Sequence, residues 1–384
     1  MERPGGRNGR SRRVLFVRTD AAVLDPRVRK ETAALQRAGY HVRVLGWDRQ
    51  SEYPVEERID GVTFRRSRIP GPYGSKLLLF VLPLFWMRIW WEIARISPGA
   101  VHACDLDALI PCLVTKLALR HSLVYDIFDM FADKLPGVPS GVRALLASFD
   151  RRCMEWSDAV IMTDERRKAS IGTPIGTPVE IVMNVPPDVP PPTGSRRGDV
   201  LRLCYAGSIH EFRGLRSIAE AVRDAEGIET TFAGWIPRAQ DERFLRSQSH
   251  LVYLGKISFE RSLQLVVDSD VVLALYDPAI PINMLASSNK VYEAMAAARP
   301  VITNNETAMA DIVREHDCGL LVPYGSVQQL REAVLLLRDQ PQLRARLGAN
   351  GLRVFQERYR WSIMEQRLLA LYASLPGADA GTTA

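Results

Sequence analysis

The chain has 384 residues, of which 47% are hydrophobic and 24% are charged, so it has the composition of an ordinary globular protein with room for two domains. Its formal net charge of +6 arises in the first half: residues 1–195 contain 28 Lys and Arg against 22 Asp and Glu, whereas residues 196–384 contain 22 of each. This balance indicates an anionic partner such as a phospholipid surface or a lipid phosphate, unless it reflects only the arginine-rich first 13 residues. Nucleic acid is not expected as a partner, because the aromatic residues of this half gather in one apolar segment instead of alternating with Lys and Arg.

The cysteines and the N-terminal segment point to a cytoplasmic protein. The five cysteines are scattered and show no CxxC spacing, which is typical of reduced, buried thiols. The first 13 residues are polar and basic and contain no apolar stretch, so we expect no signal peptide.

In the first half, short apolar runs alternate with helical patterns. A strand is predicted at residues 13–17, and Asp25 and Pro26 mark the start of a helix that ends at Gly39. The pattern then predicts a helix at residues 109–119 and further strands at 41–45, 100–103, 122–126, 159–162 and 179–183. This alternation predicts a parallel, doubly wound sheet in residues 1–190, with residues 1–12 disordered.

One segment of this half, Leu77–Trp91, is almost entirely apolar. It is too short to span a bilayer and contains Pro83, but Lys76, Arg88 and Arg95 flank it. Tryptophans suit the headgroup region of a membrane, so a peripheral membrane contact is one interpretation. The other is a helix that packs on the sheet with its tryptophans in the core.

The second half repeats the alternating pattern after a break. Residues 185–198 are rich in Pro, Gly and Ser, and we place a linker at residues 191–200. A second α/β domain follows at residues 201–357, with strands predicted at 201–207, 229–233, 250–254, 271–275, 301–303 and 319–323. A C-terminal helix is predicted within residues 358–376, and residues 377–384 are expected to be disordered.

The most informative segment is residues 287–302, which reads as a helix that leads into a buried strand. Ser287, Ser288 and Asn289 begin the helix, where free N–H groups favour a phosphate, and Lys290 adds a positive charge. Glu293 lies one turn further along, where a carboxylate can accept hydrogen bonds from a ribose diol.

This segment resembles the donor-site helix of family 4 glycosyltransferases, which are retaining enzymes with the GT-B fold. Residues 205–208 and 212–215 are similar to the loop and basic residue with which the family holds the donor diphosphate. The resemblance implies two doubly wound Rossmann-like domains that face each other across a cleft, with the C-terminal helix crossing back to the first domain. It also implies a set of donor-binding residues: Gly207, Ser208, Arg213, Asn289, Lys290 and Glu293.

In the first half, residues 25–31, 102–107 and 125–130 resemble part of the same family. The last two segments follow predicted strand ends, so they are expected to face the cleft. We predict catalytic roles for Asp105, Asp126 and Asp129, and contacts of His102 and Asp107 with a sugar or an acceptor. Helix capping or loop solvation remains the alternative for any single one of these aspartates.

The resemblance implies a retaining hexosyltransferase of polysaccharide or glycolipid biosynthesis. A UDP-, GDP- or ADP-sugar would be the donor substrate, and a lipid-linked or glycan acceptor would receive the sugar at the inner face of the cell membrane. No DxD pair follows a predicted strand of the second half, so we expect no metal and no further cofactor.

Four residues depart from the family pattern and leave another function open. Leu285 stands where many members carry a glutamate, Ser208 where many carry arginine, Cys104 where many carry histidine and Ala298 where many carry glycine. The alternative is a catalytically inactive relative that binds nucleotide or a partner transferase. An epimerase on the same architecture is disfavoured, because no clear acid/base set is present.

Overall fold

The structure is a computed structural model in which the chain forms two compact units. Unit 1 contains residues Met1–Met183 and Met364–Ala384, and unit 2 contains Asn184–Ile363. The structure describes residues 11–22, 25–71, 78–131, 138–169, 171–172, 174–188, 200–284 and 288–376. Leu285, the C-terminal tail and nearly all of the predicted linker and N-terminal disordered segment therefore lie outside the described residues.

Unit 1 is built on an eight-stranded sheet with the order β3-β4-β2-β1-β5-β6-β7-β8. Its strands are β1 (Arg13–Val17), β2 (His41–Trp47), β3 (Glu56–Ile59), β4 (Val62–Ser67), β5 (Ala100–Cys104), β6 (Ser122–Ile127), β7 (Ala159–Met162) and β8 (Val179–Ile181). The six strands predicted from the sequence in this half are therefore confirmed as β1, β2, β5, β6, β7 and β8, and each begins at its predicted residue.

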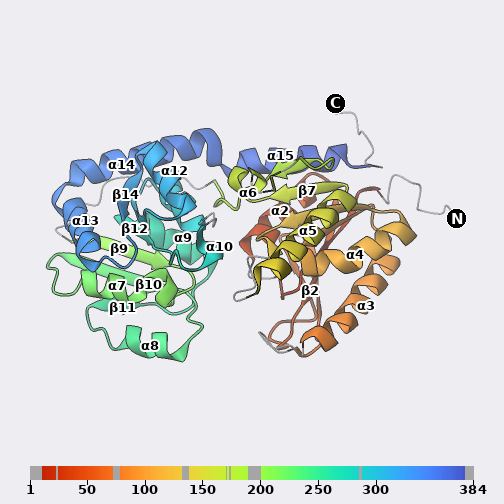
Figure 1. Cartoon of the computed structure of the whole chain (residues 1–384), viewed down its shortest axis with the longest axis horizontal. Helices are drawn as coiled ribbons and strands as arrows, with labels where there is room; N and C mark the ends of the chain where they lie inside the picture. Colours follow the sequence, from red (N-terminus) through yellow and green to blue (C-terminus); the bar gives the residue numbers. More distant parts are fainter. Residues whose placement is uncertain are drawn as a thin grey trace. The chain divides into compact units, whose positions relative to one another are not determined.

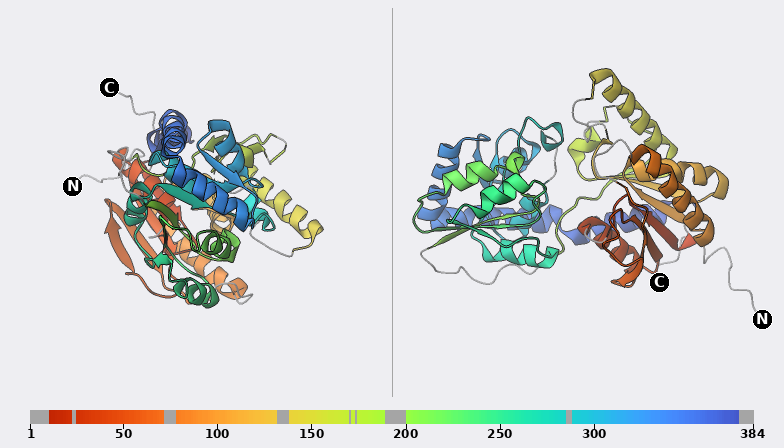
Figure 2. Two further views of the ribbon diagram at one scale, coloured as in Figure 1. Left: turned by 90° about the vertical axis from the view of Figure 1, so that its left-hand side faces the viewer. Right: turned by 90° about the horizontal axis from the view of Figure 1, so that it is seen from below.

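The helices of unit 1 cover both faces of this sheet, as Figures 1 and 2 show. They are α2 (Pro26–Arg37), α3 (Leu78–Ile96), α4 (Leu106–Leu119), α5 (Ser140–Trp156), α6 (Glu165–Ala169) and α15 (Trp361–Ser374), of which α15 joins unit 1 from Met364 onward. The crossover through α2 runs from β1 to β2, opposite in direction to the crossover through α4 from β5 to β6. Right-handed crossovers in opposite directions place their helices on opposite faces of the sheet.

The hairpin of β3 and β4 is not predicted from the sequence. β3 pairs antiparallel with β4, so the expectation of a wholly parallel first sheet is wrong at this edge. The apolar signal is weak because β3 is short and charged and β4 carries arginines. One of them, Arg66, is only 2% exposed and donates hydrogen bonds to the carbonyl oxygens of Ala21 and Pro54.

Unit 2 is a six-stranded sheet with the order β11-β10-β9-β12-β13-β14, in which all neighbouring pairs are parallel. Its strands are β9 (Leu201–Ala206), β10 (Ile228–Ala233), β11 (Leu251–Tyr253), β12 (Val271–Ala274), β13 (Val301–Asn304) and β14 (Gly319–Val322). The α-helices are α7 (Leu215–Ala221), α8 (Ala239–Arg246), α9 (Phe259–Asp268), α10 (Pro281–Met284), α11 (Asn289–Ala296), α12 (Ala308–His316), α13 (Val327–Asp339) and α14 (Pro341–Val354). The strand order reverses between β9 and β12, which is where a doubly wound sheet places its ligand.

Local sequence signals explain several element boundaries. Asp25 caps α2, because its carboxylate accepts hydrogen bonds from the N–H groups of Arg27 and Val28, and Pro26 occupies the first helical position.

All five cysteines are free and buried, as predicted. None of the described helices has both the length and the hydropathy that a bilayer-spanning segment needs.

The loops after β9 and β10 touch at two glycines. Gly234 has a φ of 137°, and a Cβ at this position would lie 1.8 Å from the carbonyl oxygen of Gly207. Only glycine allows these two backbones to approach so closely.

Gly234→Ala is therefore expected to destabilise unit 2 by about 2–4 kcal/mol, because the loop after β9 must move and the new side chain is strained at a positive φ. Chemical denaturation measures the change. Gly141→Ala is the control: a Cβ there meets nothing within 4 Å and the position is helical, so stability should not fall. Equal stability of the two variants would contradict this account of the loop.

Candidate active site

The predicted donor-binding residues lie on three segments of unit 2. Gly207 and Ser208 follow β9, Arg213 ends the short helix η2 (Glu211–Arg213), and Asn289, Lys290 and Glu293 belong to α11. A Cβ on Gly207, whose φ is 134°, would lie 2.9 Å from Nζ of Lys290. The structure thus brings the loop after β9 against the first turn of α11.

Two of these residues, Arg213 and Lys290, share one aromatic ring. The guanidinium carbon of Arg213 lies 4.0 Å from the ring centroid of Tyr276, and Nζ of Lys290 lies 5.7 Å from the same centroid. Nζ of Lys290 also lies 4.9 Å from the ring centroid of Tyr205. The two positive charges are therefore neighbours, held by aromatic faces that attract cations.

Neither cation forms a salt bridge with a carboxylate anywhere in the part of the chain that the structure describes. One terminal nitrogen of Arg213 is shielded from solvent and makes no hydrogen bond. Burial alone would lower the pKa of Lys290, but the hydroxyl groups of Tyr205 and Tyr276 outweigh it and raise this pKa above its ordinary value. Lys290 thus stays charged, and the pair forms a positive site that no salt bridge among the described residues neutralises.

Tyr276 was not predicted as a site residue, although it lies two residues beyond the end of β12. Its hydroxyl makes a short hydrogen bond with Oγ of Ser288, the N-cap residue of α11. Burial would raise the pKa of this phenol, but Lys290 and Arg213 lower it. The position of Tyr276 at the carboxyl end of a parallel strand is the sequence signal that could have found it.

The remaining donor-side residues surround this positive site. Glu293 is 8% exposed and lies near enough to Lys290 to help raise the pKa of that ammonium. Asn289 is half-buried at the start of α11. The carbonyl oxygen of Ser208 accepts a hydrogen bond from the Tyr205 hydroxyl at 2.7 Å, so the loop is fixed to β9.

His210 is a further residue of this site that was not predicted. Its Nδ1 atom is shielded from solvent and makes no hydrogen bond. Partial burial and the charge of Arg213 lower the pKa of His210 to about 4. The imidazole is therefore neutral near neutral pH, and its Nδ1 can take part in a hydrogen bond with a ligand.

The predicted residues of unit 1 lie at the carboxyl ends of β5 and β6. Asp105 precedes α4 with a φ of 68° and is 5% exposed. Its carboxylate accepts hydrogen bonds from Arg18 Nη1 at 2.9 Å and from the N–H of Phe128 at 3.1 Å. These bonds fix the loop after β6 to the end of β5.

Asp126 and His102 are both fully buried. The carboxylate of Asp126 accepts hydrogen bonds from Nε of Arg27 at 3.0 Å and from Nη2 of Arg27 at 2.6 Å. Burial would raise the pKa of Asp126, but Arg27 outweighs it and lowers this pKa to about 2. Asp126 is therefore an ion-pair partner inside the protein, with no atom placed at a surface to act on a substrate.

The same buried cluster includes a residue of the C-terminal helix. His102 stacks on Phe16 with ring centroids 3.9 Å apart, and its Nδ1 lies 2.8 Å from the hydroxyl of Tyr372 on α15. Burial lowers the pKa of His102 and raises the pKa of Glu31, whose Oε1 lies 3.1 Å from Nε of Arg27. We call Arg27, Glu31, His102, Asp126 and Tyr372 the Arg27 cluster.

Asp107 and Asp129 are more accessible than Asp105 and Asp126. Asp107 accepts a hydrogen bond from the Thr19 hydroxyl at 2.6 Å and is half-buried. The side chain of Asp129 is 36% exposed and accepts a hydrogen bond from Nη1 of Arg167 at 3.0 Å. Of the predicted residues of unit 1, these two can reach a ligand from solvent.

The spacing of one group of residues is compatible with a metal ion, but its chemistry is not. Ligand atoms of His102, Cys104 and Asp126 all lie within 4.8 Å of one another. However, Arg27 occupies both oxygens of Asp126, and burial raises the pKa of the Cys104 thiol well above its usual value. A protonated thiol and an occupied carboxylate are poor ligands, so these residues do not fit a metal site.

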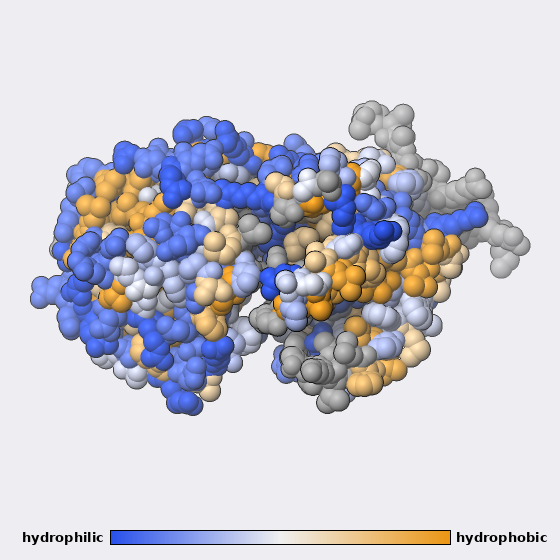
Figure 3. Space-filling model, in the orientation of Figure 1, coloured by the Kyte–Doolittle hydropathy of each residue, from blue (hydrophilic) through white to orange (hydrophobic). Residues whose placement is uncertain are grey.

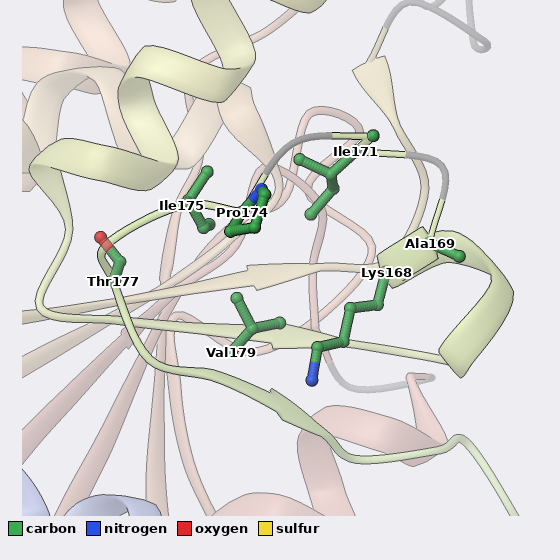
Figure 4. A pocket seen from close by; sticks show the side chains of 8 residues that line it. Lys168, Ala169, Ile171, Pro174, Ile175, Thr177 and Val179 are labelled. Carbon is green, nitrogen blue, oxygen red and sulfur yellow. The ribbon is translucent and has the colours of Figure 1, made fainter.

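A separate hollow of about 390 Å³ lies in unit 1, between α6 and β8. Figure 4 shows the side chains of Lys168, Ile171, Ile175 and Val179 around it. It contains none of the predicted site residues.

Two family profiles match most of the chain. The family described as "Glycosyl transferases group 1" matches residues 201–340, and the "Glycosyl transferase 4-like domain" family matches residues 24–187. The chain belongs to the family 4 glycosyltransferases. The phosphatidyl-myo-inositol mannosyltransferase of Mycobacterium leprae is 28% identical over 140 residues, which cover 35% of this chain and 36% of that protein. The match therefore spans only about a third of this relative's own length.

Solved structures of other glycosyltransferases confirm the predicted GT-B fold. Sucrose-phosphate synthase of Thermosynechococcus elongatus matches with a TM-score of 0.77 and 16% identity, over 94% of this chain and 98% of that chain. HepE of Anabaena, in complex with UDP and glucose, matches with a TM-score of 0.69 and 14% identity, over 94% of this chain and 100% of that chain. At these identities the likeness establishes the fold of this family 4 member and not its substrates.

Arg27→Ala is expected to destabilise unit 1 by about 3–5 kcal/mol, because it leaves the buried carboxylate of Asp126 without its partner. The free energy of unfolding measures this change. Arg29→Ala on the same helix is the control and should cost less than about 1 kcal/mol, since Arg29 and its partner Asp60 are both partly exposed. If both variants are equally stable, the Arg27 cluster does not hold unit 1 together.

Proposed function

We propose that this protein transfers a sugar from a nucleotide-sugar donor to a lipid-linked or glycan acceptor, with retention at the anomeric carbon. The observation that carries the proposal is the pair of neighbouring cations, Arg213 and Lys290, that has no salt bridge to a carboxylate among the described residues. Buried or shielded charges are normally paired, so such a pair fits an anionic ligand. A nucleoside diphosphate is an anion of suitable chemistry, and HepE of Anabaena, which shares the fold, is in complex with UDP.

The same pair supports catalysis without a divalent ion. Negative charge grows on the diphosphate as its bond to the sugar breaks, and Arg213, Lys290 and the N–H groups at the start of α11 would stabilise it. The base of the nucleotide can be uracil, guanine or adenine. Glu293 and Asn289 are the side chains of α11 that we assign to the donor.

In unit 1, we assign acceptor or sugar contacts to Asp107 and Asp129, because both have accessible carboxylates. Asp105 positions the loop after β6 instead, and Asp126 and His102 attach α2 and α15 to the sheet, because their side chains are engaged inside the protein. A lipid-linked acceptor is supported by the basic first half and by the exposed apolar residues of α3. The mycobacterial relative is also named for a phospholipid, phosphatidyl-myo-inositol.

The competing proposal is a catalytically inactive relative that binds nucleotide or a partner transferase. It is favoured by Ser208, which stands where many family members have an arginine, and by the full burial of Asp126. Incubation with labelled UDP-, GDP- and ADP-sugars and a membrane extract separates the two. Transfer of label from one donor supports the enzyme, whereas nucleotide binding without transfer or hydrolysis supports the inactive relative.

Lys290→Met and Arg213→Met are each expected to weaken binding of the matching nucleoside diphosphate by about 30-fold, since a charge-assisted hydrogen bond contributes about 2 kcal/mol. Calorimetric titration measures the affinity. Arg216→Met is the matched control: Arg216 lies on α7, three residues after Arg213, its side chain is 52% exposed, and it pairs with Glu211. A loss of affinity in the control as large as in the two site variants would contradict the assignment.

A further inference from the structure

Helix α3 exposes an apolar stripe on the side that faces away from the core of unit 1. Phe85, Ile89 and Ile93 are fully buried, as expected for the inner face. Phe80, Leu84, Met87 and Trp91 are 79%, 48%, 52% and 47% exposed. These four residues are spaced three or four apart, so they lie on one face of the helix. A helix that is apolar on both faces is typical of one whose outer face contacts another apolar phase.

The stripe continues onto the neighbouring helices. The helices α3 and α4 pack together, as do α4 and α5. Leu117 on α4 is 86% exposed and Leu145 on α5 is 70% exposed. Figure 3 shows hydrophobic residues gathered over α3, α4 and α5 on the face turned to the viewer. An exposed apolar surface that spreads over several helices is typical of an interaction site.

Three arginines surround Trp91 near the C-terminal end of the stripe. The guanidinium carbons of Arg65, Arg88 and Arg95 lie 5.4, 4.2 and 5.1 Å from the ring centroid of Trp91. Within the described part of the chain, their only carboxylate partner is Glu92, which is 2% exposed. Three guanidinium groups against one carboxylate leave two positive charges in excess.

This group of arginines is short of negative charge. Nε of Arg65 is shielded from solvent and makes no hydrogen bond. Burial, with Arg65 and Arg95 close by, lowers the pKa of Arg88 below its usual value. A phosphate oxygen placed among them would relieve the repulsion and accept the hydrogen bonds that these groups still offer.

We infer that α3, α4 and α5 form a surface that docks on a bilayer containing anionic phospholipid, with one lipid phosphate bound among Arg65, Arg88 and Arg95. The apolar stripe enters the boundary between headgroups and acyl chains, and Trp91 lies at the level of the headgroups. This inference rests on the proposed lipid-side acceptor, but docking needs only unit 1 and can be measured without the transfer reaction.

The charge excess decides between a membrane and another copy of the chain. A second copy would bring the same excess of arginine to the interface, and like charges would repel. An anionic bilayer supplies phosphate for the arginines and an apolar interior for the stripe. The occupant is therefore a lipid surface.

The test is flotation of the full chain with vesicles of phosphatidylcholine alone and with an equal mixture of phosphatidylcholine and phosphatidylglycerol. We expect binding to the mixed vesicles that weakens as salt is raised, and weaker binding to phosphatidylcholine alone. Arg88→Gln combined with Arg95→Gln should reduce binding to the mixed vesicles about 30-fold, since each arginine near an anionic surface contributes about fivefold. Leu84→Gln combined with Met87→Gln should reduce binding to both kinds of vesicle by about tenfold or more.

Two control variants lie in unit 2. Arg223→Gln combined with Arg314→Gln removes two exposed, paired arginines, and Leu336→Gln removes an apolar side chain that is 38% exposed. Both should bind vesicles as the unaltered protein does. Equal binding of the unaltered protein to both vesicles, or equal losses in the control and docking variants, overturns the inference. The inference is also overturned if the protein does not bind vesicles and light scattering shows a dimer that dissociates when Leu84→Gln is combined with Met87→Gln.

The docking surface and the proposed sugar-transfer activity can each be contradicted without contradicting the other. Vesicle binding that follows these expectations without sugar transfer supports the docking surface and counts against the proposed enzyme. Transfer to an acceptor by protein that does not bind vesicles counts against the docking surface and supports the enzyme.

Discussion

Two positive charges in unit 2 lie side by side with no salt bridge to a carboxylate among the described residues, and the proposed donor site depends on them. Arg213 and Lys290 come from segments far apart in the sequence, yet both lie against the ring of Tyr276. The fold produces this arrangement by placing η2 and the start of α11 at the carboxyl edge of one parallel sheet, and by allowing the loop after β9 to approach Lys290 through Gly207. The faces of the aromatic rings attract both cations and keep them side by side.

In unit 1, by contrast, the buried arginine is paired with a carboxylate. Arg27 is 1% exposed and is fully paired with Asp126, so the Arg27 cluster contributes rigidity and no open binding site. Tyr372 of α15 completes the cluster from the end of the chain. The parts of unit 1 that a ligand can reach are therefore the carboxylates of Asp107 and Asp129 and the outer surfaces of α3, α4 and α5.

The sequence predicted the parts of this structure that depend on local patterns. Buried strands such as β1 and β9 were visible as apolar runs, and α11 was recognisable from its first residues and from Lys290. Two kinds of feature were not predictable. The strands β3 and β4 lack an apolar signal because arginine and glutamate occupy them. Tyr372 acts through a contact between distant segments, and the burial of Asp126 depends on the same kind of contact, so a single sequence does not reveal them.

The most direct test of the central claim is to measure how much of the ligand's affinity comes from its two phosphates. Calorimetry with UDP, GDP and ADP identifies the base that binds best, and the corresponding nucleoside is then titrated under the same conditions. If Arg213 and Lys290 hold the diphosphate, the nucleoside diphosphate should bind about 100-fold or more tightly than the nucleoside. Equal affinity of the two ligands would contradict the account.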